Sequence, residues 1–270
     1  MGASWPAYAP AMTTAAEKWR DDLASWAIPE DIQAQAPQDP WIHPVAQFRA
    51  PDGPIPDSPA HAVAREALPD GGSVLDVGCG GGRAALALVP PAGLIIGVDH
   101  QQGMLDALAE AADKRGIAHE EILGDWPDVA DRTPVADVVV CHHVAYNVWE
   151  LPDFVRALTA HARHRVVLEL PVRHPLTWMN PLWKQFWDLD RPVSPTAADA
   201  LQVIRDAGYG AHLVEYDDVT QRIPLDPRAQ AESACIRLCL PVSRAEEVAA
   251  AVQAADAGMP RRLAAIWWDA

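Results

Sequence analysis

The stretch Val74-Leu75-Asp76-Val77-Gly78-Cys79-Gly80-Gly81-Gly82 decides the fold, because it leads from a buried strand directly into a glycine-rich turn. The apolar run Ser73–Val77 predicts the strand, and the residues after the turn predict a helix through Ala84–Val89. Glycines at such a junction allow the backbone to approach a ligand closely at the N-terminus of the helix. The stretch therefore predicts a ligand-binding strand–turn–helix unit.

Strand and helix patterns alternate along the chain after this unit. This alternation is typical of a mostly parallel sheet with helices on both faces. We expect an α/β fold with a doubly wound, mostly parallel seven-stranded sheet, in which the last strand runs antiparallel between the fifth and the sixth. The strands are expected at about Ser73–Val77, Leu94–Val98, His119–Leu123, Ala136–Cys141, Arg165–Leu170, Ala211–Tyr216 and Arg262–Trp268.

Two segments lie outside this alternation. Residues 1–60 hold 10 of the 25 prolines and four tryptophans, and they predict an N-terminal helical arm that packs on a main domain of residues 61–270. A Trp-rich insertion of about 171–195 follows the fifth strand, and its Trp183 and Trp187 share a helical face because they are four residues apart. The insertion is either a lid over an apolar or planar acceptor or a helix tucked against the sheet.

The composition limits the classes of partner. The chain has 21 Lys and Arg against 37 Asp and Glu, a net charge of -16, which argues against binding to a nucleic-acid backbone or an anionic membrane. The longest apolar stretch, 84–98, is interrupted by Pro90-Pro91 and Gly93 and cannot span a bilayer. The four cysteines form neither a CxxC pair nor a Cys/His finger, so we expect a soluble cytoplasmic protein with reduced thiols and no metal site.

Asp99 closes the second predicted strand, 21 residues after Gly78. An acid in this place can hold both ribose hydroxyls of a nucleoside, which favours a ligand site over a plain tight turn. The dinucleotide fingerprint requires glycine at its first, third and sixth positions, and Arg83 occupies the sixth. A bulky arginine conflicts with close helix–strand packing around a pyrophosphate, so the nucleoside is not expected to be a dinucleotide.

The Asp-x-Gly-x-Gly-x-Gly spacing from Asp76 to Gly82 resembles motif I of the class I S-adenosylmethionine-dependent methyltransferases. Asp99 followed by Met104-Leu105 resembles the acidic and apolar positions that come after motif I in this family, and Gly124-Asp125-Trp126 resembles its adenine-binding turn. The resemblance covers roughly residues 70–217 and is concentrated in the cofactor half. It implies a Rossmann-like methyltransferase of the small-molecule type.

The resemblance also implies a role for each cofactor-binding residue. From the methionine end to the adenine these are Gly78, Gly80 and Gly82 around the methionine moiety, Asp76 at its ammonium, Asp99 at the ribose, Asp125 at the adenine amino group, and Trp126 with Met104 on the two faces of the ring. The alternative for Trp126 and for Met104 is an ordinary core position.

The fourth strand ends in Cys141-His142-His143-Val144-Ala145-Tyr146-Asn147, and in this family that end often leads into the active site. The Asn/Asp-Pro-Pro-Tyr signature of methyltransferases acting on adenine or glutamine is missing here, which disfavours those acceptors. His142 and His143 are candidates for a general base, one facing the pocket and the other packing away because strand side chains alternate. Tyr146 and Asn147 are candidates for orienting the acceptor. Alternatively the histidines are structural, and positioning alone drives the transfer.

Glu169, at the end of the fifth strand, lies next to the edge of the sheet where ligands bind in this fold class, although a solvated acid is an equal alternative. We therefore expect a methyltransferase that modifies an oxygen or a nitrogen of a small-molecule acceptor, aromatic or apolar. The alternatives are an NAD- or nucleotide-binding oxidoreductase, which Arg83 disfavours, a non-catalytic cofactor-binding scaffold of the same fold, and a macromolecular methyltransferase, for which acidity makes RNA the poorer substrate.

Overall fold

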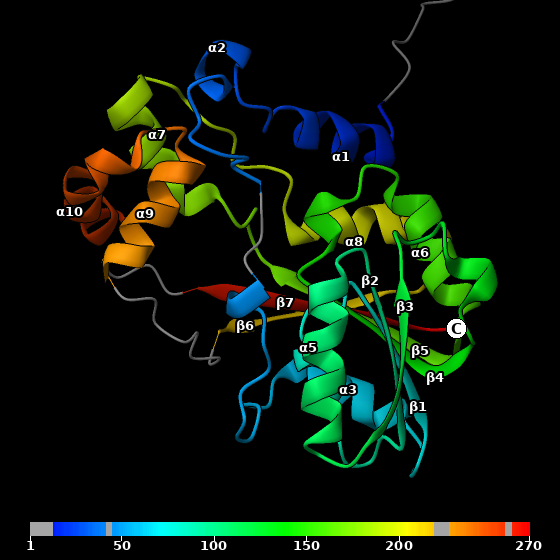
Figure 1. Ribbon diagram of the computed structural model, residues 1–270. Helices are drawn as coiled ribbons and strands as arrows, with labels where there is room; N and C mark the ends of the chain where they lie inside the picture. Colours follow the sequence, from blue (N-terminus) through cyan, green and yellow to red (C-terminus); the bar gives the residue numbers. More distant parts are fainter. Residues whose placement is uncertain (1–12, 42–44, 219–226, 257–260) are drawn as a thin grey trace, which may run out of the picture.

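A seven-stranded sheet forms the centre of the computed structural model, which describes residues 13–41, 45–218, 227–256 and 261–270 (Figure 1). The strand order is β3-β2-β1-β4-β5-β7-β6. All neighbours pair in parallel except β7, which runs antiparallel between β5 and β6, as the sequence predicted. The strands are β1 (Ser73–Val77), β2 (Leu94–Asp99), β3 (Ala118–Leu123), β4 (Ala136–His142), β5 (Ala162–Pro171), β6 (His212–Asp217) and β7 (Arg262–Asp269).

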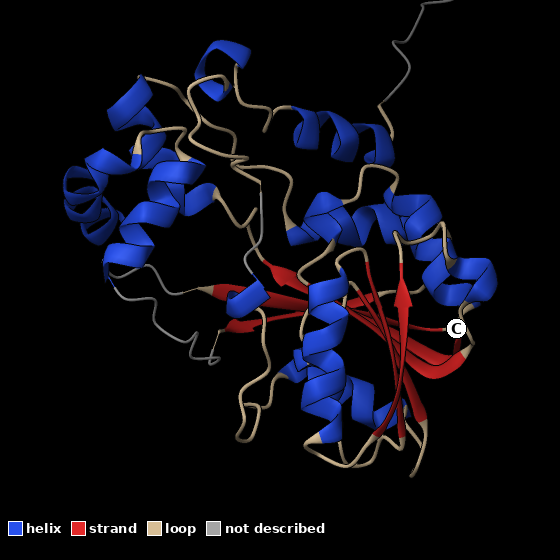
Figure 2. Ribbon diagram, viewed as in Figure 1, coloured by secondary structure: helices blue, strands red, loops and turns tan. Residues whose placement is uncertain are grey.

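Helices cover both faces of the sheet (Figure 2). One face packs against α3 (Pro59–Ala67), α4 (Arg83–Leu86) and α5 (Gln102–Asp113). The other face packs against α6 (Leu151–Ala160) and α8 (Ala197–Asp206), and α1 (Ala15–Ala24) lies on α8. Successive strand residues point to opposite faces, so in β4 the side chains of Val138 and Val140 face α3 while Val139 and Cys141 face α6. The predicted doubly wound α/β fold is confirmed.

A separate helical cluster lies beside the ends of β6 and β7 (Figure 1). It consists of α2 (Glu30–Gln33), α7 (Asn180–Trp187), α9 (Pro227–Arg237) and α10 (Ala245–Asp256), which share an apolar core. Trp183 is 3% exposed in this core, and the indole Nε1 of Trp187 donates to the Leu238 carbonyl at 2.7 Å. The two tryptophans therefore pack inside the helical cluster, and among the described residues α7 lies against other helices and not against the sheet.

The N-terminal arm is fixed to the rest of the chain by its tryptophans. Trp19 is fully buried, and its Nε1 donates to the Val148 carbonyl at 2.8 Å. The Nε1 of Trp26 donates to the Ser194 carbonyl at 2.6 Å, and the Trp26 ring stacks on His174 with 3.8 Å between ring centroids. Burial of two large aromatic rings, each with its N–H satisfied, holds α1 and the following turn in place.

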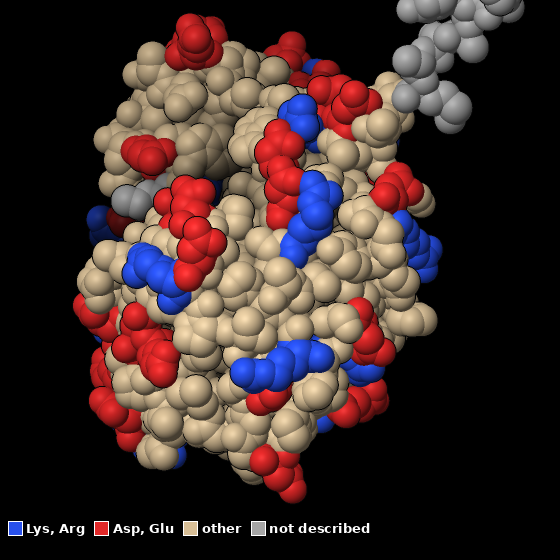
Figure 3. Space-filling model, turned by 90° about the vertical axis from the view of Figure 1, so that its right-hand side faces the viewer, with Lys and Arg blue, Asp and Glu red and all other residues tan. Residues whose placement is uncertain are grey.

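Three further observations concern the surface charges, the helices and the side chains that could hold a metal ion. Acidic side chains are spread over the face shown in Figure 3, and lysines and arginines often lie next to them. No helix in the described ranges combines the length and the apolar character that crossing a bilayer requires. Within the same ranges, no three His, Cys, Asp or Glu side chains are arranged to hold a metal ion.

Candidate active site

The glycine turn after β1 has a backbone that only glycine adopts easily. Gly78, Gly80 and Gly82 have φ values of 69°, 50° and 80°. The amides of Gly78 and Cys79 donate to the Val98 carbonyl at 2.8 and 3.0 Å, which ties the turn to β2. A Cβ on Gly78 would lie 2.4 Å from Cγ2 of Val144, so the turn also lies directly against the segment that follows β4.

Asp99 joins the end of β2 to this turn. Its carboxylate accepts from the Gly80 amide through Oδ2 at 3.0 Å and from the Gln101 amide through Oδ1 at 2.9 Å. The residue is 8% exposed. Two backbone donors therefore fix the direction of a nearly buried carboxylate at the carboxyl edge of the sheet, which is where the sequence predicts a ribose contact.

Asp76 lies beneath the turn and is almost fully buried. Its Oδ2 accepts from the Ala85 amide at 3.2 Å. Burial raises the pKa of Asp76 to about 7, although the Ala85 hydrogen bond opposes this shift. The side chain is therefore close to the point where it can gain or lose a proton at neutral pH.

A segment of the arm covers the glycine turn. The Phe48 carbonyl accepts from the Gly81 amide at 3.2 Å, and Arg49 pairs with Gly81 in an isolated parallel bridge. A Cβ on Gly81 would lie 2.6 Å from that carbonyl, which explains the additional glycine between Gly80 and Gly82. The Arg49 guanidinium also pairs with Glu110 of α5 at 2.7 Å. The contact of Phe48 and Arg49 with the turn was not predicted from the sequence. The additional glycine at position 81 is the one feature of the sequence that indicates a close neighbour there.

The residues assigned to adenine are placed on two faces of the sheet. Trp126 packs on the α6 face with its ring edge-on to His161 at 4.8 Å between centroids, and its Nε1 is buried without a hydrogen-bond partner in the described structure. Met104 is buried on α5, a helix of the opposite face. Asp125 is exposed beside Gly124, whose amide donates to the Asp99 carbonyl at 2.9 Å. The sandwich of Trp126 and Met104 around a ring stays a prediction.

Both histidines at the end of β4 approach Glu169, and the expectation that only one of them faces the pocket stays a prediction. His142 lies on the α3 face, with Nδ1 3.6 Å from Oε1 of Glu169. β4 ends there, and His143 has a left-handed φ of 63°, which breaks the alternation of side chains. The Nε2 of His143 consequently lies 3.3 Å from the same Oε1.

The two imidazoles differ in exposure. The side chain of His142 is 8% exposed, its ring stacks on His61 at 5.5 Å, and its Nε2 is buried without a partner in the described structure. Burial lowers the pKa of His142 to about 3, so this ring is neutral at physiological pH. The side chain of His143 is 44% exposed. Of the two, His143 is the imidazole that a ligand can reach.

Glu169 is the centre of a buried polar cluster contributed by α3, β4, β5 and β6. Its Oε2 accepts from Ser58 Oγ at 3.0 Å and from the Tyr216 hydroxyl, and Ser58 Oγ lies 3.2 Å from Nδ1 of His61. Burial alone raises the pKa of Glu169, but the imidazoles of His142 and His143 and the Tyr216 hydroxyl outweigh it and hold the pKa well below its usual range. Glu169 is therefore a carboxylate. No sequence pattern indicates Ser58, His61 or Tyr216 as members of this cluster.

Tyr146 lies apart from this cluster. Its hydroxyl donates to the Pro171 carbonyl at 2.8 Å, and its ring stacks on Trp19 at 5.7 Å. The residue is buried, and burial raises the pKa of the hydroxyl far above its ordinary value. The catalytic role that the sequence predicted for Tyr146 stays a prediction, and these contacts favour a structural role.

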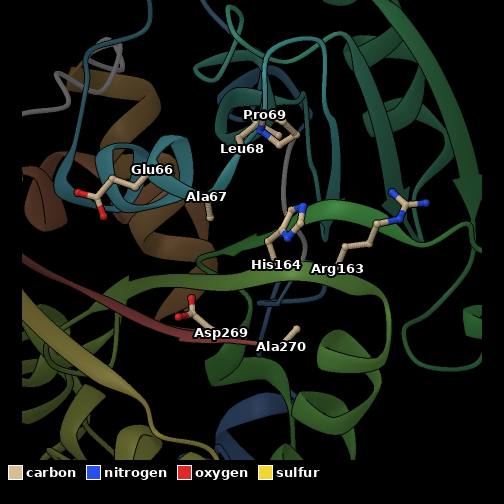
Figure 4. A pocket seen from close by; sticks show the side chains of 8 residues that line it. All are labelled: Glu66, Ala67, Leu68, Pro69, Arg163, His164, Asp269 and Ala270. Carbon is tan, nitrogen blue, oxygen red and sulfur yellow. The ribbon is translucent and has the colours of Figure 1, made fainter.

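Two surface hollows lie away from the Glu169 cluster. One of about 510 Å³ is at the opposite end of the sheet, where Glu66, Arg163, His164 and Asp269 are among its lining residues (Figure 4). It contains none of the predicted site residues. The other, of about 380 Å³, lies between Trp126 and residues 147–150. The residues that carry chemistry therefore gather around the glycine turn, Asp99 and Glu169 rather than around the larger hollow.

Comparison with known proteins agrees with this arrangement. The family model described as a methyltransferase domain matches residues 74–165, which run from β1 into β5. A protein of Haemophilus influenzae that carries no functional description is 37% identical over 97 residues, which are 36% of this chain and 36% of that protein. The chain thus matches about a third of the length of that relative.

Two solved structures have the same fold. One is coclaurine N-methyltransferase bound to N-methylheliamine and S-adenosylhomocysteine (SAH), with a TM-score of 0.50, 12% identity, and coverage of 95% of this chain and 87% of that one. The other is the plantazolicin methyltransferase BamL with a triazolic analogue and SAH, with a TM-score of 0.50, 14% identity, and coverage of 93% and 98%. The predicted class I methyltransferase fold is confirmed.

Proposed function

We propose that this chain, whose residues 74–165 match a methyltransferase-domain family model, transfers a methyl group from S-adenosylmethionine to a small-molecule acceptor. The observation that carries the proposal is the hydrogen bond between Asp99 and the Gly80 amide, which brings the acid after β2 against the glycine turn after β1. An acid and a glycine turn in this relation suit a nucleoside with a flexible polar tail.

The residues present fit this cofactor. The positive φ values of Gly78, Gly80 and Gly82 open the backbone at the turn, and Asp99 offers a carboxylate already oriented by two amides. Asp76, when ionised, would contact the ammonium, and Asp99 would accept from the ribose hydroxyls. When bound, S-adenosylmethionine supplies an electrophilic methyl group.

Three residues of the cofactor half are assigned to the adenine. We propose that Asp125, Met104 and Trp126 contact the adenine, as the family resemblance implies. The exposure of Asp125 and the free Nε1 of Trp126 are compatible with a ligand, whereas the packing of Trp126 on the α6 face also suits a core residue.

The acceptor is proposed to be a small molecule. A net charge of -16 supports this choice over a nucleic acid, because a polyphosphate backbone requires clustered cations. The four cysteines are all free and buried, which supports a reducing compartment such as the cytoplasm. Trp183 and Trp187 suggested an aromatic acceptor, but both pack inside the helical cluster. They therefore give no support to an aromatic acceptor over another small molecule.

A nucleotide-dependent oxidoreductase is the competing function. Arg83 stands at the first position of α4, where the dinucleotide fingerprint needs a glycine for close helix–strand packing. This residue supports a cofactor without a pyrophosphate.

The test is methyl transfer from isotopically labelled S-adenosylmethionine to a panel of phenols, alcohols and amines, followed by mass spectrometry. We expect at least one acceptor to gain a labelled methyl group with the parent and much less with Asp99→Ala. SAH binding without transfer to any acceptor would support the scaffold alternative instead. Hydride exchange with a nicotinamide cofactor would support the oxidoreductase.

A further inference from the structure

Glu169 has two oxygens with different tasks. Oε2 accepts two hydroxyl hydrogen bonds, from Ser58 at 3.0 Å and from Tyr216. Oε1 accepts neither of them and faces the imidazoles of His142 and His143. Because Ser58, the N-cap of α3, and Tyr216 of β6 both lie on the α3 face of the sheet, they hold Oε2 from that face and leave Oε1 toward the imidazoles at the end of β4.

Of the two imidazoles, His143 is the closer to Oε1. The distance from its Nε2 is 3.3 Å, against 3.6 Å from Nδ1 of His142, which is too long for a hydrogen bond. The backbone strengthens the pairing, because the His143 amide donates to the Glu169 carbonyl at 2.6 Å. The main chain and the side chain of His143 therefore both contact Glu169 of β5.

The backbone at His143 is unusual for a non-glycine residue. Its φ of 63° lies in the left-handed region, and it is this turn that swings the ring toward Glu169 instead of the α6 face. Strained backbone of this kind persists where surrounding contacts hold it, and it is concentrated at functional sites. At this backbone conformation, the half-exposed imidazole of His143 lies next to the buried carboxylate of Glu169.

We propose that His143 is the residue that removes a proton from the methyl acceptor and that Glu169 is the positioning residue that orients it. This inference rests on the proposed methyl transfer and specifies its substrate class as a hydroxyl or a protonated amine. Nε2 carries the proton that faces Oε1, so Nδ1 is the basic atom. Ser58 and Tyr216 act through Glu169 by fixing its carboxylate.

The acceptor O–H or N–H bond breaks, and its proton passes to Nδ1 of His143. The electron pair of that bond forms the new bond to the methyl carbon, whose bond to sulfur breaks with its pair going to sulfur. The resulting imidazolium faces the carboxylate of Glu169, which stabilises its charge. Acceptors without a proton on the reacting atom, such as thioethers or tertiary amines, make no use of this arrangement.

The test combines one spectroscopic and one kinetic measurement on the full chain. Long-range proton–nitrogen spectra of the imidazoles at neutral pH report which ring nitrogen carries the proton, without any acceptor. We expect His143 to be protonated at Nε2 in the parent, to become a mixture of tautomers in Glu169→Gln, and to retain most of its preference in Tyr216→Phe. A His143 ring protonated at Nδ1, or one unchanged by Glu169→Gln, would overturn the proposal.

The kinetic arm uses 4-nitrophenol and benzylamine as hydroxyl and amine probes. His143→Asn is the variant of choice, because asparagine tolerates a left-handed backbone. We expect it to lower kcat by about 100-fold or more with little change in KM, and Glu169→Gln to lower kcat about tenfold. His164→Asn is the control, because His164 is also half exposed and faces a carboxylate, Asp137 at 3.9 Å, at the far end of the sheet.

Binding of SAH separates this proposal from the proposed function. If the parent fails to bind SAH, the proposed function fails, whatever the tautomer of His143. If every variant binds SAH like the parent and His143→Asn transfers methyl groups at the parental rate, the proposed function stands and the role of His143 is refuted. If neither probe is methylated, the tautomer measurement decides between a positioned base and a structural cluster.

Discussion

The carboxylate of Asp99 accepts a hydrogen bond of 3.0 Å from the amide of Gly80, so the end of β2 is joined to the glycine turn after β1. This contact places a nearly buried anion beside the open backbone of the turn. A nucleoside cofactor bound there would interact with both elements at once.

Replacing Asp99 tests the anion. Asp99→Ala is expected to weaken SAH binding roughly 10- to 100-fold, because hydrogen bonds to a charged group contribute about 1.5–3 kcal/mol. Calorimetric titration measures the change. Asp106→Ala is the matched control, since Asp106 is exposed on α5 and accepts from the Gln102 side chain at 2.8 Å. An affinity of Asp99→Ala within twofold of the parent would contradict the assignment.

Replacing Gly78 tests the close approach of the turn to the segment after β4. Gly78 and Gly71 have similar φ values of 69° and 73°, but a Cβ on Gly78 would lie 2.4 Å from Val144 whereas one on Gly71 meets nothing within 4 Å. Gly71→Ala should cost about 1 kcal/mol of unfolding free energy, and Gly78→Ala clearly more. Chemical denaturation measures both, and Val144→Ala should recover part of the loss in Gly78→Ala. Equal losses in the two glycine variants would rule out the steric argument.

Asp76 gives a pH dependence of stability. Its pKa rises from 3.8 to about 7 on burial, so the folded chain holds a proton that the unfolded chain releases. The contribution of Asp76 to the unfolding free energy is therefore complete below pH 3.8 and is lost as the pH rises through about 7. Asp76→Asn should remove this part of the pH dependence. Identical pH profiles for parent and variant between about pH 5 and pH 8 would show that Asp76 does not hold the proton.

Ionisation of Asp76 lowers the stability of the folded chain, but it should strengthen binding of the cofactor. The ammonium of the cofactor requires the carboxylate form of Asp76, so SAH should bind the parent several-fold more tightly at about pH 8 than at about pH 6. Titration of Asp76→Asn at both values is the control and should show no such gain. A parent affinity that falls over this range would argue against contact between Asp76 and the ammonium.

Arg191 connects the arm to the helical cluster. Its guanidinium carbon lies 5.5 Å from the Trp26 ring centroid and 5.1 Å from that of Trp183, and it donates to the carbonyls of Trp26 and Ala27. Arg191→Lys should lose about 1–3 kcal/mol of stability, because an ammonium cannot reproduce the planar contacts. Hydrogen exchange should accelerate in α1 and α2, while Arg173→Lys, at an exposed position, leaves both unchanged.

The sheet and its order could be predicted because its determinants are local. Apolar runs mark β1, β2, β4, β5 and β7, and glycines adjoin β1, β2 and β3. Asp76, Gly78 and Asp99 lie within 24 residues of one another. The division into an arm of residues 1–60 and a main domain of residues 61–270 stays a prediction. Hydrogen exchange in Arg191→Lys tests one of the contacts that hold the arm.

The acceptor half could not be predicted in the same way. Ser58 and Glu169 are 111 residues apart, and Tyr216 follows after a further 47, so no sequence pattern links them. His143 was predicted, but the left-handed φ that turns it toward Glu169 was not, because a regular strand would have sent it to the other face. For Trp183 the sequence leaves a lid and a helix against the sheet as alternatives, because helical periodicity does not reveal which partner a face packs against.

Calorimetric titration of the parent with SAH and, separately, with NADH distinguishes a site for S-adenosylmethionine from a site for a dinucleotide. We expect saturable one-to-one binding of SAH that is strongly weakened in Asp99→Ala, and no heat of binding with NADH. Binding of NADH that depends on Asp99, with no response to SAH, would contradict the proposal that this site holds S-adenosylmethionine.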